Sequence, residues 1–306
     1  MRLIRSRSLR AAASALSLLL ALPACAKAPQ PSQAQANDAD PALWVVKDKD
    51  TTIYLFGTIH VLRPGLTWFD EAVKAAFDRS NELVLETVLP APDQMADLVK
   101  AVGLAAPGTP PLSERIPADR RAAFDAAVVA TGAPPGAFDR FKPWLAATQL
   151  SIGPVGKLGY ETVNAPEAVL TAAAKSAGKP VLGLETPQQQ LGYFGALSDG
   201  AQMALLTETL DEMPKVGETI GRMVDDWAKG RPDALADEMN DSLKASPEIA
   251  RSLLLDRNRR WAEWVTARMQ KPGTVFIAVG AGHLAGQGSL QALLAQRGLK
   301  VRRVRY

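Results

Sequence analysis

Two stretches of sequence decide the fold: TTIYLFGTIH at residues 51–60 and TVFIAVGAGH at residues 274–283. Each begins as an apolar, β-branched run and ends in Gly-x-x-His, and His60 and His283 are the two histidines of the chain. Such runs predict buried strands, and the glycine permits a sharp turn after each strand. In open α/β sheets, ligands bind at the carboxyl ends of the strands. If the two strands are neighbours, both imidazoles face one crevice.

Two glutamates follow predicted strands in the same way. Glu86 ends the apolar run 83–85, Glu185 ends the run 181–184, and each stands in the tripeptide Leu-Glu-Thr. A charge directly after a buried strand is costly unless it is paired or binds a ligand. Two imidazoles with one or two carboxylates can bind a divalent metal such as Mn, Co, Zn or Fe, and an open position on that metal can activate water. A carboxylate that does not bind the metal is a candidate general base.

Strands alternate with helices along the remainder of the chain. Residues 43–46 and 51–56 predict a hairpin, and the periodicity over residues 68–81 predicts a helix. Further strands are expected at residues 83–85, 181–184, 274–279 and 300–305. We therefore expect a single α/β domain over residues 41–306, in which helices flank a mixed β-sheet and residues 187–270 or so form a largely helical insertion.

The N-terminus is typical of an exported protein. Four arginines precede an Ala-, Leu- and Ser-rich run, which predicts a signal peptide over residues 1–24. The tetrapeptide ending at Cys25 resembles a lipobox, which would make Cys25 the lipid anchor of an envelope protein, with the outer membrane favoured. The small residues around Cys25 also fit an ordinary signal peptidase, which would release the protein into the periplasm. Residues 25–40 are rich in Pro, Gln, Ala and Ser and predict a flexible tether.

Composition narrows the remaining classes of function. A single cysteine excludes a disulfide framework and a cysteine-based zinc module. The net charge of +3 arises from the four arginines that precede Cys25, and without them the chain is nearly neutral. Electrostatics therefore gives no support to a nucleic-acid partner.

The ordered motifs resemble the TraB/PrgY/GumN family, which includes the animal Tiki proteases. Order and spacing agree over residues 43–306 or so. One departure is TVN at residues 162–164, where such proteins often carry Gly-hydrophobic-Asp. The matching stretches are LFGTIH (55–60), ELVLE (82–86), GLET (183–186) with QL (190–191), DRNRRW (256–261) and FIAVGAGHL (276–284).

The resemblance implies a fold similar to the erythromycin esterase and ChaN-like group. By similarity to the Tiki proteases it also implies a metal-dependent hydrolase, with His60, His283 and Glu86 at the metal and a peptide or protein as the suspected substrate. For bacterial GumN-type members the family does not specify the substrate. The matching pair Arg257-Asn258 lies on a basic helix, where Arg257 can pair with a site carboxylate or bind an anionic intermediate. A solvated basic face is the alternative for that helix.

Three hypotheses of function stay open at this point. The first is an exported, peptidase-like metal-dependent hydrolase in which Glu86, Glu185 and Arg257 are catalytic. The second is a metal-free hydrolase in which a histidine is the general base and Glu86 orients it. The third is an envelope lipoprotein that binds haem or a metal without turnover.

Overall fold

The computed structural model describes residues 38–244 and 246–306, so the predicted signal peptide, Cys25 and most of the predicted tether lie outside the described residues. Six strands in the described part form one mixed sheet in the order β4-β3-β5-β2-β1-β6. No helix within those two ranges is long and apolar enough to cross a membrane. The strands are β1 (Leu43–Lys47), β2 (Thr51–Thr58), β3 (Glu82–Leu85), β4 (Val181–Gly183), β5 (Gly273–Gly280) and β6 (Val301–Arg303).

The two strands that carry the Gly-x-x-His motifs are neighbours in the middle of the sheet. β2 pairs with β5 in parallel, and Thr58 lies opposite Gly280. β3 pairs in parallel with β5 and with β4, so the carboxyl ends of β2, β3, β4 and β5 share one edge. The predicted hairpin of β1 and β2 is confirmed as an antiparallel pair, and β6 closes the far edge antiparallel to β1.

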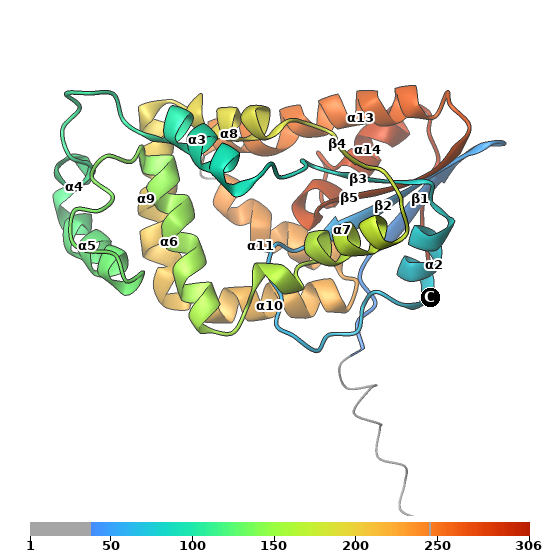
Figure 1. The fold of residues 1–306 in the computed structure, drawn as a ribbon, viewed down its shortest axis with the longest axis horizontal. Helices are drawn as coiled ribbons and strands as arrows, with labels where there is room; N and C mark the ends of the chain where they lie inside the picture. The colour runs from blue at the N-terminus through green and yellow to red at the C-terminus, as the bar shows by residue number, and fades with distance from the viewer. Residues whose placement is uncertain (1–37, 245) are drawn as a thin grey trace, which may run out of the picture. The chain divides into compact units, whose positions relative to one another are not determined.

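Helices cover both faces of the sheet (Figure 1). On one face, the aromatic side chains of Phe56 and Phe276 pack with Trp68, Phe77 and Trp227. The helices on this face are α2 (Glu71–Arg79), α7 (Pro166–Ser176) and α10 (Val216–Ala228).

On the other face, Ile277 and Val279 pack with Trp261 and Val265 of α13 and with Leu294 of α14. These helices cover residues Asp256–Arg268 (α13) and Leu290–Gln296 (α14). Because both faces of the sheet are covered, the central strand β5 is apolar on both sides, and residues 275–279 form an unbroken apolar run. The expected α/β fold with a mixed sheet is confirmed.

Some of the other helices build a second core beside the sheet, in which Phe124, Leu150 and Leu206 are buried. This core joins residues 112–150 to residues 203–213, so two segments contribute to it. We expected an insertion confined to residues 187–270. Within that range α10 and α13 pack on the sheet instead, because Trp227 and Trp261 are buried there. The second core takes its helical residues from α4 (Leu112–Arg115), α5 (Arg121–Ala130), α6 (Pro143–Lys157) and α9 (Asp199–Glu212). The remaining α-helices of the described part are α3 (Pro92–Gly103), α8 (Pro187–Gly195), α11 (Pro232–Lys244) and α12 (Pro247–Ala250).

The packed domain begins a few residues before the boundary predicted from composition. Ala39 is buried and its amide donates to the Thr67 carbonyl at 2.9 Å. The Asp40 amide donates to the Ala228 carbonyl at 2.7 Å. Residues 38–40 therefore belong to the domain, because their backbone groups bind it.

Val279 of the central strand β5 tests the packing of the sheet against its helices. Val279 is 0% exposed, so Val279→Ala removes buried methyl groups and should lower the free energy of unfolding by about 1–3 kcal/mol. Urea denaturation measures the change. Val163→Ala is the matched control, since Val163 is 68% exposed and should change stability by less than about 0.5 kcal/mol. Equal losses in the two variants would contradict the burial of β5.

Candidate active site

The four predicted site residues follow the four parallel strands at their shared edge. His60 comes two residues after β2, Glu86 directly follows β3, Glu185 comes two residues after β4, and His283 lies in the 3-10 turn Ala281–Leu284 after β5. The pairing of β3 with β4 continues past the ends of the two strands, where the Glu185 amide donates to the Glu86 carbonyl at 2.9 Å. The sheet thus brings all four side chains to one region of the molecule.

A glycine allows the two Leu-Glu-Thr segments to run side by side. A Cβ atom on Gly183 would lie 2.8 Å from the Glu185 carbonyl and 3.3 Å from the Cα of Thr87. Real Cβ atoms do not approach backbone so closely, so any larger residue at this position would push the segments apart. The glycine therefore contributes to the placement of both glutamates.

Arg257 is the centre of the buried part of the site. Its side chain is 8% exposed, and Nη2 donates to Glu86 Oε2 at 2.5 Å and to Glu185 Oε1 at 2.6 Å. Nε also donates to Glu185, and Nη1 donates to the Leu253 carbonyl at 3.0 Å. Of the two outcomes that we left open for Arg257, the structure shows the pairing with site carboxylates. A buried charge needs such partners, since isolated burial of an ion costs several kcal/mol.

His283 is buried against Trp261, with the ring centroids 4.3 Å apart. Its Nε2 accepts from Arg257 Nη1 at 3.1 Å, and its Nδ1 lies 2.6 Å from Asn258 Oδ1. Because a guanidinium can only donate, Nε2 must be the acceptor and Nδ1 carries the proton. Burial, together with the charges of Arg257 and His60, lowers the pKa of His283 to about 4 against the effect of Glu86. The ring is therefore neutral at pH 7.

Glu86 is held by donors on both carboxylate oxygens. Oε1 accepts from the Gly280 amide at 2.7 Å and lies 3.7 Å from His283 Nε2, while Oε2 accepts from Gln190 at 3.0 Å as well as from Arg257. Burial by itself would raise the pKa of Glu86. This effect of burial is outweighed by the positive charges of protonated His283, of Arg257 and of His60, and by the hydrogen bond from the Gly280 amide. Together they lower the pKa of Glu86 to about 2.

Gly280 is the point on which the three candidate metal ligands converge. A Cβ atom built there would lie 3.1 Å from Glu86 Oε1, 3.7 Å from His283 Cδ2 and 4.0 Å from His60 Nε2. The missing side chain therefore leaves a small cradle bounded by a carboxylate and two imidazoles. A reacting group or an ion in that cradle would contact all three side chains.

His60 differs from His283 because its side chain is 75% exposed. Its Nδ1 lies 2.8 Å from Oε1 of Glu167, and the same oxygen accepts from Thr58 Oγ1 at 2.7 Å. The hydrogen bond that His60 donates to Glu167, with the charges of Glu167 and Glu86, raises the pKa of His60 to about 9, against partial burial and the charge of Arg257. Solvent around the exposed ring reduces this effect.

The motifs did not point to Glu167, which belongs to the first turn of α7. The available signal was the departure at residues 162–164, where an acid of the family pattern is absent and a glutamate follows three residues later. Asn258 and Gln190 were part of the matching motifs, but only the structure shows that they bind His283 and Glu86.

Whether His60, His283 and Glu86 can bind a metal depends on the hydrogen bonds that these side chains already make. In the described ranges, no three His, Cys, Asp or Glu side chains are gathered as a ready metal-binding group. The donor chemistry nevertheless fits a divalent metal. Both imidazoles use Nδ1 for an oxygen partner, which is the usual arrangement of metal-binding histidines. His283 Nε2 lies 3.7 Å from Glu86 Oε1, and His60 Nε2 lies 4.0 Å from the Cβ position on Gly280. At His283 the Nε2 lone pair accepts from Arg257, so that contact must be given up for a metal to bind.

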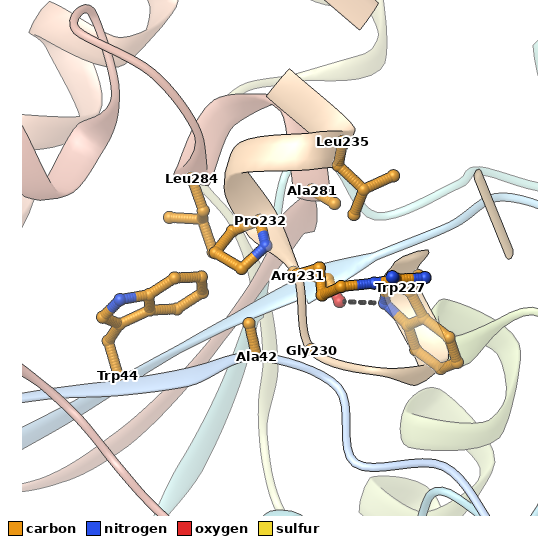
Figure 2. Close-up of a pocket in the computed structure, with 10 residues that line it drawn as sticks. Ala42, Trp44, Trp227, Gly230, Arg231, Pro232, Leu235, Ala281 and Leu284 are labelled. Atoms are coloured by element: carbon orange, nitrogen blue, oxygen red, sulfur yellow. Dashed lines mark hydrogen bonds between the residues drawn. The ribbon is translucent and has the colours of Figure 1, made fainter. Parts of the chain in front are cut away.

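A small cavity lies behind the first Gly-x-x-His turn (Figure 2). Its volume is about 10 Å³, which is room for about one water molecule, and it is lined mainly by apolar side chains. Trp227 Nε1 donates to the Gly57 carbonyl at 2.8 Å there, as the dashed line in Figure 2 marks. This cavity is too small for a substrate, and the contact fixes α10 against the turn that precedes His60.

Comparison with known proteins supports this arrangement of motifs. The model of the TraB/PrgY/gumN family matches residues 42–303, which is most of the chain. The chain belongs to the TraB/PrgY/gumN family. It is 25% identical over 259 residues to the uncharacterized protein YbaP of Escherichia coli strain K12, covering 83% of this chain and 92% of that protein. The YbaP protein of Shigella flexneri matches to the same extent, and no solved structure gives a significant match.

The low pKa of Glu86 predicts how this TraB-family protein responds to acid. The folded pKa of about 2 lies below the unfolded value of 4.5, so ionised Glu86 stabilises the fold at pH 7. That contribution is fully present above pH 4.5 and is lost as the pH falls through 2. Glu86→Gln should therefore unfold more easily at pH 7, and its deficit should shrink by more than half at pH 3.

Urea denaturation between pH 7 and pH 3, with a chelator present, measures this deficit. Glu263→Gln is the matched control, since Glu263 is exposed and its pair with Arg297 is long at 3.8 Å. A Glu86→Gln deficit that stays constant over this range would contradict the low pKa.

Proposed function

We propose that the protein is a hydrolase whose site is the cradle at Gly280, and that it cleaves peptide-like substrates. The observation that carries the proposal is the convergence of Glu86 Oε1, His283 and His60 Nε2 on that one position. Two imidazoles of different basicity beside an ionised carboxylate are the groups that water activation and proton transfer require. The family resemblance to the Tiki proteases supports the same class of reaction.

A divalent metal would be held by His60 Nε2, His283 Nε2 and Glu86 Oε1. When bound, it would lower the pKa of a water molecule and polarise a substrate carbonyl. Glu167 and Asn258 would keep each imidazole in the tautomer that presents Nε2. Glu185 would keep Arg257 in place, so that the guanidinium can stabilise negative charge on a substrate oxygen.

A metal-free hydrolase is the second candidate, and the contact of Arg257 with His283 Nε2 favours it. In this reaction the neutral form of His60, which is the minor form at pH 7 because of its raised pKa, takes a proton from water as the water oxygen adds to the substrate carbonyl carbon. The same proton then passes to the leaving nitrogen as the bond between carbon and nitrogen breaks. The N–H groups of Arg257 are already bound to Glu86, Glu185, Leu253 and His283, so its charge would stabilise the oxyanion electrostatically between the two steps.

The helical part of the molecule supports a polypeptide as the substrate. A hollow of about 1070 Å³ lies among α6, α9, α10 and α11, which is the size of the larger ligand sites in proteins. Its lining is mostly apolar, and Ile249 of α12 contributes to it. The turn after α12 leads through residues 251–255 directly into the helix that carries Arg257, so the hollow and the cradle share one helical connection.

The N-terminal sequence supports a place for this activity outside the cytoplasm. Residues 1–24 have the pattern of a signal peptide, and Cys25 stands where a lipid anchor would be attached. We infer an envelope hydrolase that is either periplasmic or held at a membrane by Cys25, and that acts on a peptide or protein partner.

Metal content distinguishes the two candidate reactions. Elemental analysis after loading with Mn, Co, Zn or Fe should find about one metal per chain, and His60→Ala and His283→Gln should both lose it. Gln is used at position 283 because the site is buried and Ala would open a cavity. Glu263→Gln should keep the metal, because Glu263 is exposed and is not one of the candidate ligands. A folded protein that takes up no metal would reject the first candidate and leave hydrolysis by His60 to be tested in chelator.

Filling the cradle tests the position of the site in either reaction. Gly280 has φ −49° and ψ 135°, which alanine also adopts, so Gly280→Ala adds a methyl group without backbone strain. We expect metal affinity or hydrolysis to fall on the order of tenfold or more. Gly221→Ala in α10 is the matched control, because a Cβ atom at that position would meet nothing within 4 Å. Equal behaviour of the two variants would contradict a site at Gly280.

A further inference from the structure

Glu167 binds His60 from α7, a helix that follows the 3-10 turn Thr162–Asn164. α7 begins at Pro166, so Glu167 lies in its first turn, close to residues 162–164, where the family's usual acid is replaced. Its Oε1 accepts from His60 Nδ1 at 2.8 Å and from Thr58 Oγ1 at 2.7 Å. One carboxylate oxygen therefore binds both the end of β2 and the histidine that follows it.

We propose that Glu167 is the positioning residue of His60: it holds the Nδ1–H tautomer and directs Nε2 toward Gly280 and Glu86. An ionised carboxylate can only accept, so the proton of this hydrogen bond belongs to Nδ1. In the neutral ring Nε2 then has a free lone pair, and it lies 4.0 Å from the position of a Cβ on Gly280. The role rests on the proposed function, in which that lone pair binds a metal or takes a proton from water.

The environment of Glu167 supports a fixed orientation. Its Oε2 is shielded from solvent and has no hydrogen-bond partner among the described residues. Leaving a buried acceptor unpaired is costly, so another requirement must keep the carboxylate in this orientation. The two hydrogen bonds at Oε1 supply it, and the one from the imidazole is the stronger charge-assisted kind.

The partner of the other histidine shows why a carboxylate is needed at His60. His283 is buried and packed on Trp261, and the neutral amide of Asn258 is enough to fix its tautomer. His60 is exposed, so its ring would otherwise rotate in water and exchange tautomers freely. A hydrogen bond between neutral groups holds an exposed ring weakly. A hydrogen bond to an ionised acceptor is roughly twice as strong.

The chain has two histidines, so a protein labelled with ¹⁵N in its imidazoles gives two ring spectra that can be followed by NMR. At pH 10 both rings are neutral, and the wild type should show His60 as the Nδ1–H tautomer. Glu167→Ala should shift His60 toward the Nε2–H tautomer and leave His283 unchanged, which also verifies the fold. Glu161→Ala is the matched control, because Glu161 lies on the same segment and binds Asn164, not a histidine.

Glu167→Gln is the milder variant, since it keeps the shape and an acceptor oxygen but removes the charge. It should retain more of the Nδ1–H tautomer than Glu167→Ala and less than the wild type. An unchanged His60 spectrum in both variants would overturn the proposal, whatever the metal content or activity of the protein.

Zn²⁺ affinity at pH 7, measured by calorimetry, gives a second readout. Glu167→Ala should bind Zn²⁺ about 10–100-fold more weakly than the wild type, while Glu161→Ala should bind it equally well. Wild-type affinity in Glu167→Ala would overturn the positioning role. A wild type that binds no Zn²⁺ would reject the metal-dependent reaction only, and the tautomer shift would still decide the role of Glu167.

Discussion

The burial of the Arg257 guanidinium is the constraint on which the site depends. A cation that is shielded from water must meet several acceptors at once, and here they come from separate parts of the chain. Glu86 follows β3, Glu185 follows β4, and His283 follows β5, so Arg257 of α13 ties three strand ends together. The same positive charge helps to keep Glu86 ionised and His283 neutral. Assembly of the sheet edge and the chemistry of the site therefore have one cause.

The helix that carries Arg257 begins in an unusual way. Residues Arg251–Leu255 form a π-helical turn, and the Leu253 carbonyl in that turn accepts from Arg257 Nη1. Isolated π-helical turns are rare and often mark functional sites. Here the turn gives the guanidinium one more acceptor and connects the helical part of the protein to the sheet edge.

The two Gly-x-x-His motifs are alike in sequence but have different chemical environments. His283 is buried with an amide and a guanidinium as partners, which keeps it neutral, whereas His60 is exposed with a carboxylate as partner, which makes it basic. A pair of titratable groups whose pKa values are moved apart is the usual arrangement for acid and base roles in one site. The repeated motif places both imidazoles at one edge of the sheet, and the neighbouring side chains make one of them neutral and the other basic.

Much of this arrangement followed from local sequence. The strands, the hairpin and the Gly-x-x-His and Leu-Glu-Thr ends were predictable, because each depends on residues close together in the chain and on a period of two or a continuous apolar run. Parallel strands then require the four strand ends to share an edge. His60, His283, Glu86 and Glu185 were expected at that edge for this reason.

The partners of these residues depended on tertiary structure. That Arg257 pairs with both glutamates and with His283, and that Glu167 binds His60, requires side chains more than 25 residues apart to meet, and no local pattern specifies such contacts. The extent of the helical core was missed for the same reason: periodicity shows that a helix has an apolar face but not which surface that face covers. Sequence patterns thus located the site, and long-range packing decided which atoms hold each ring and carboxylate in place.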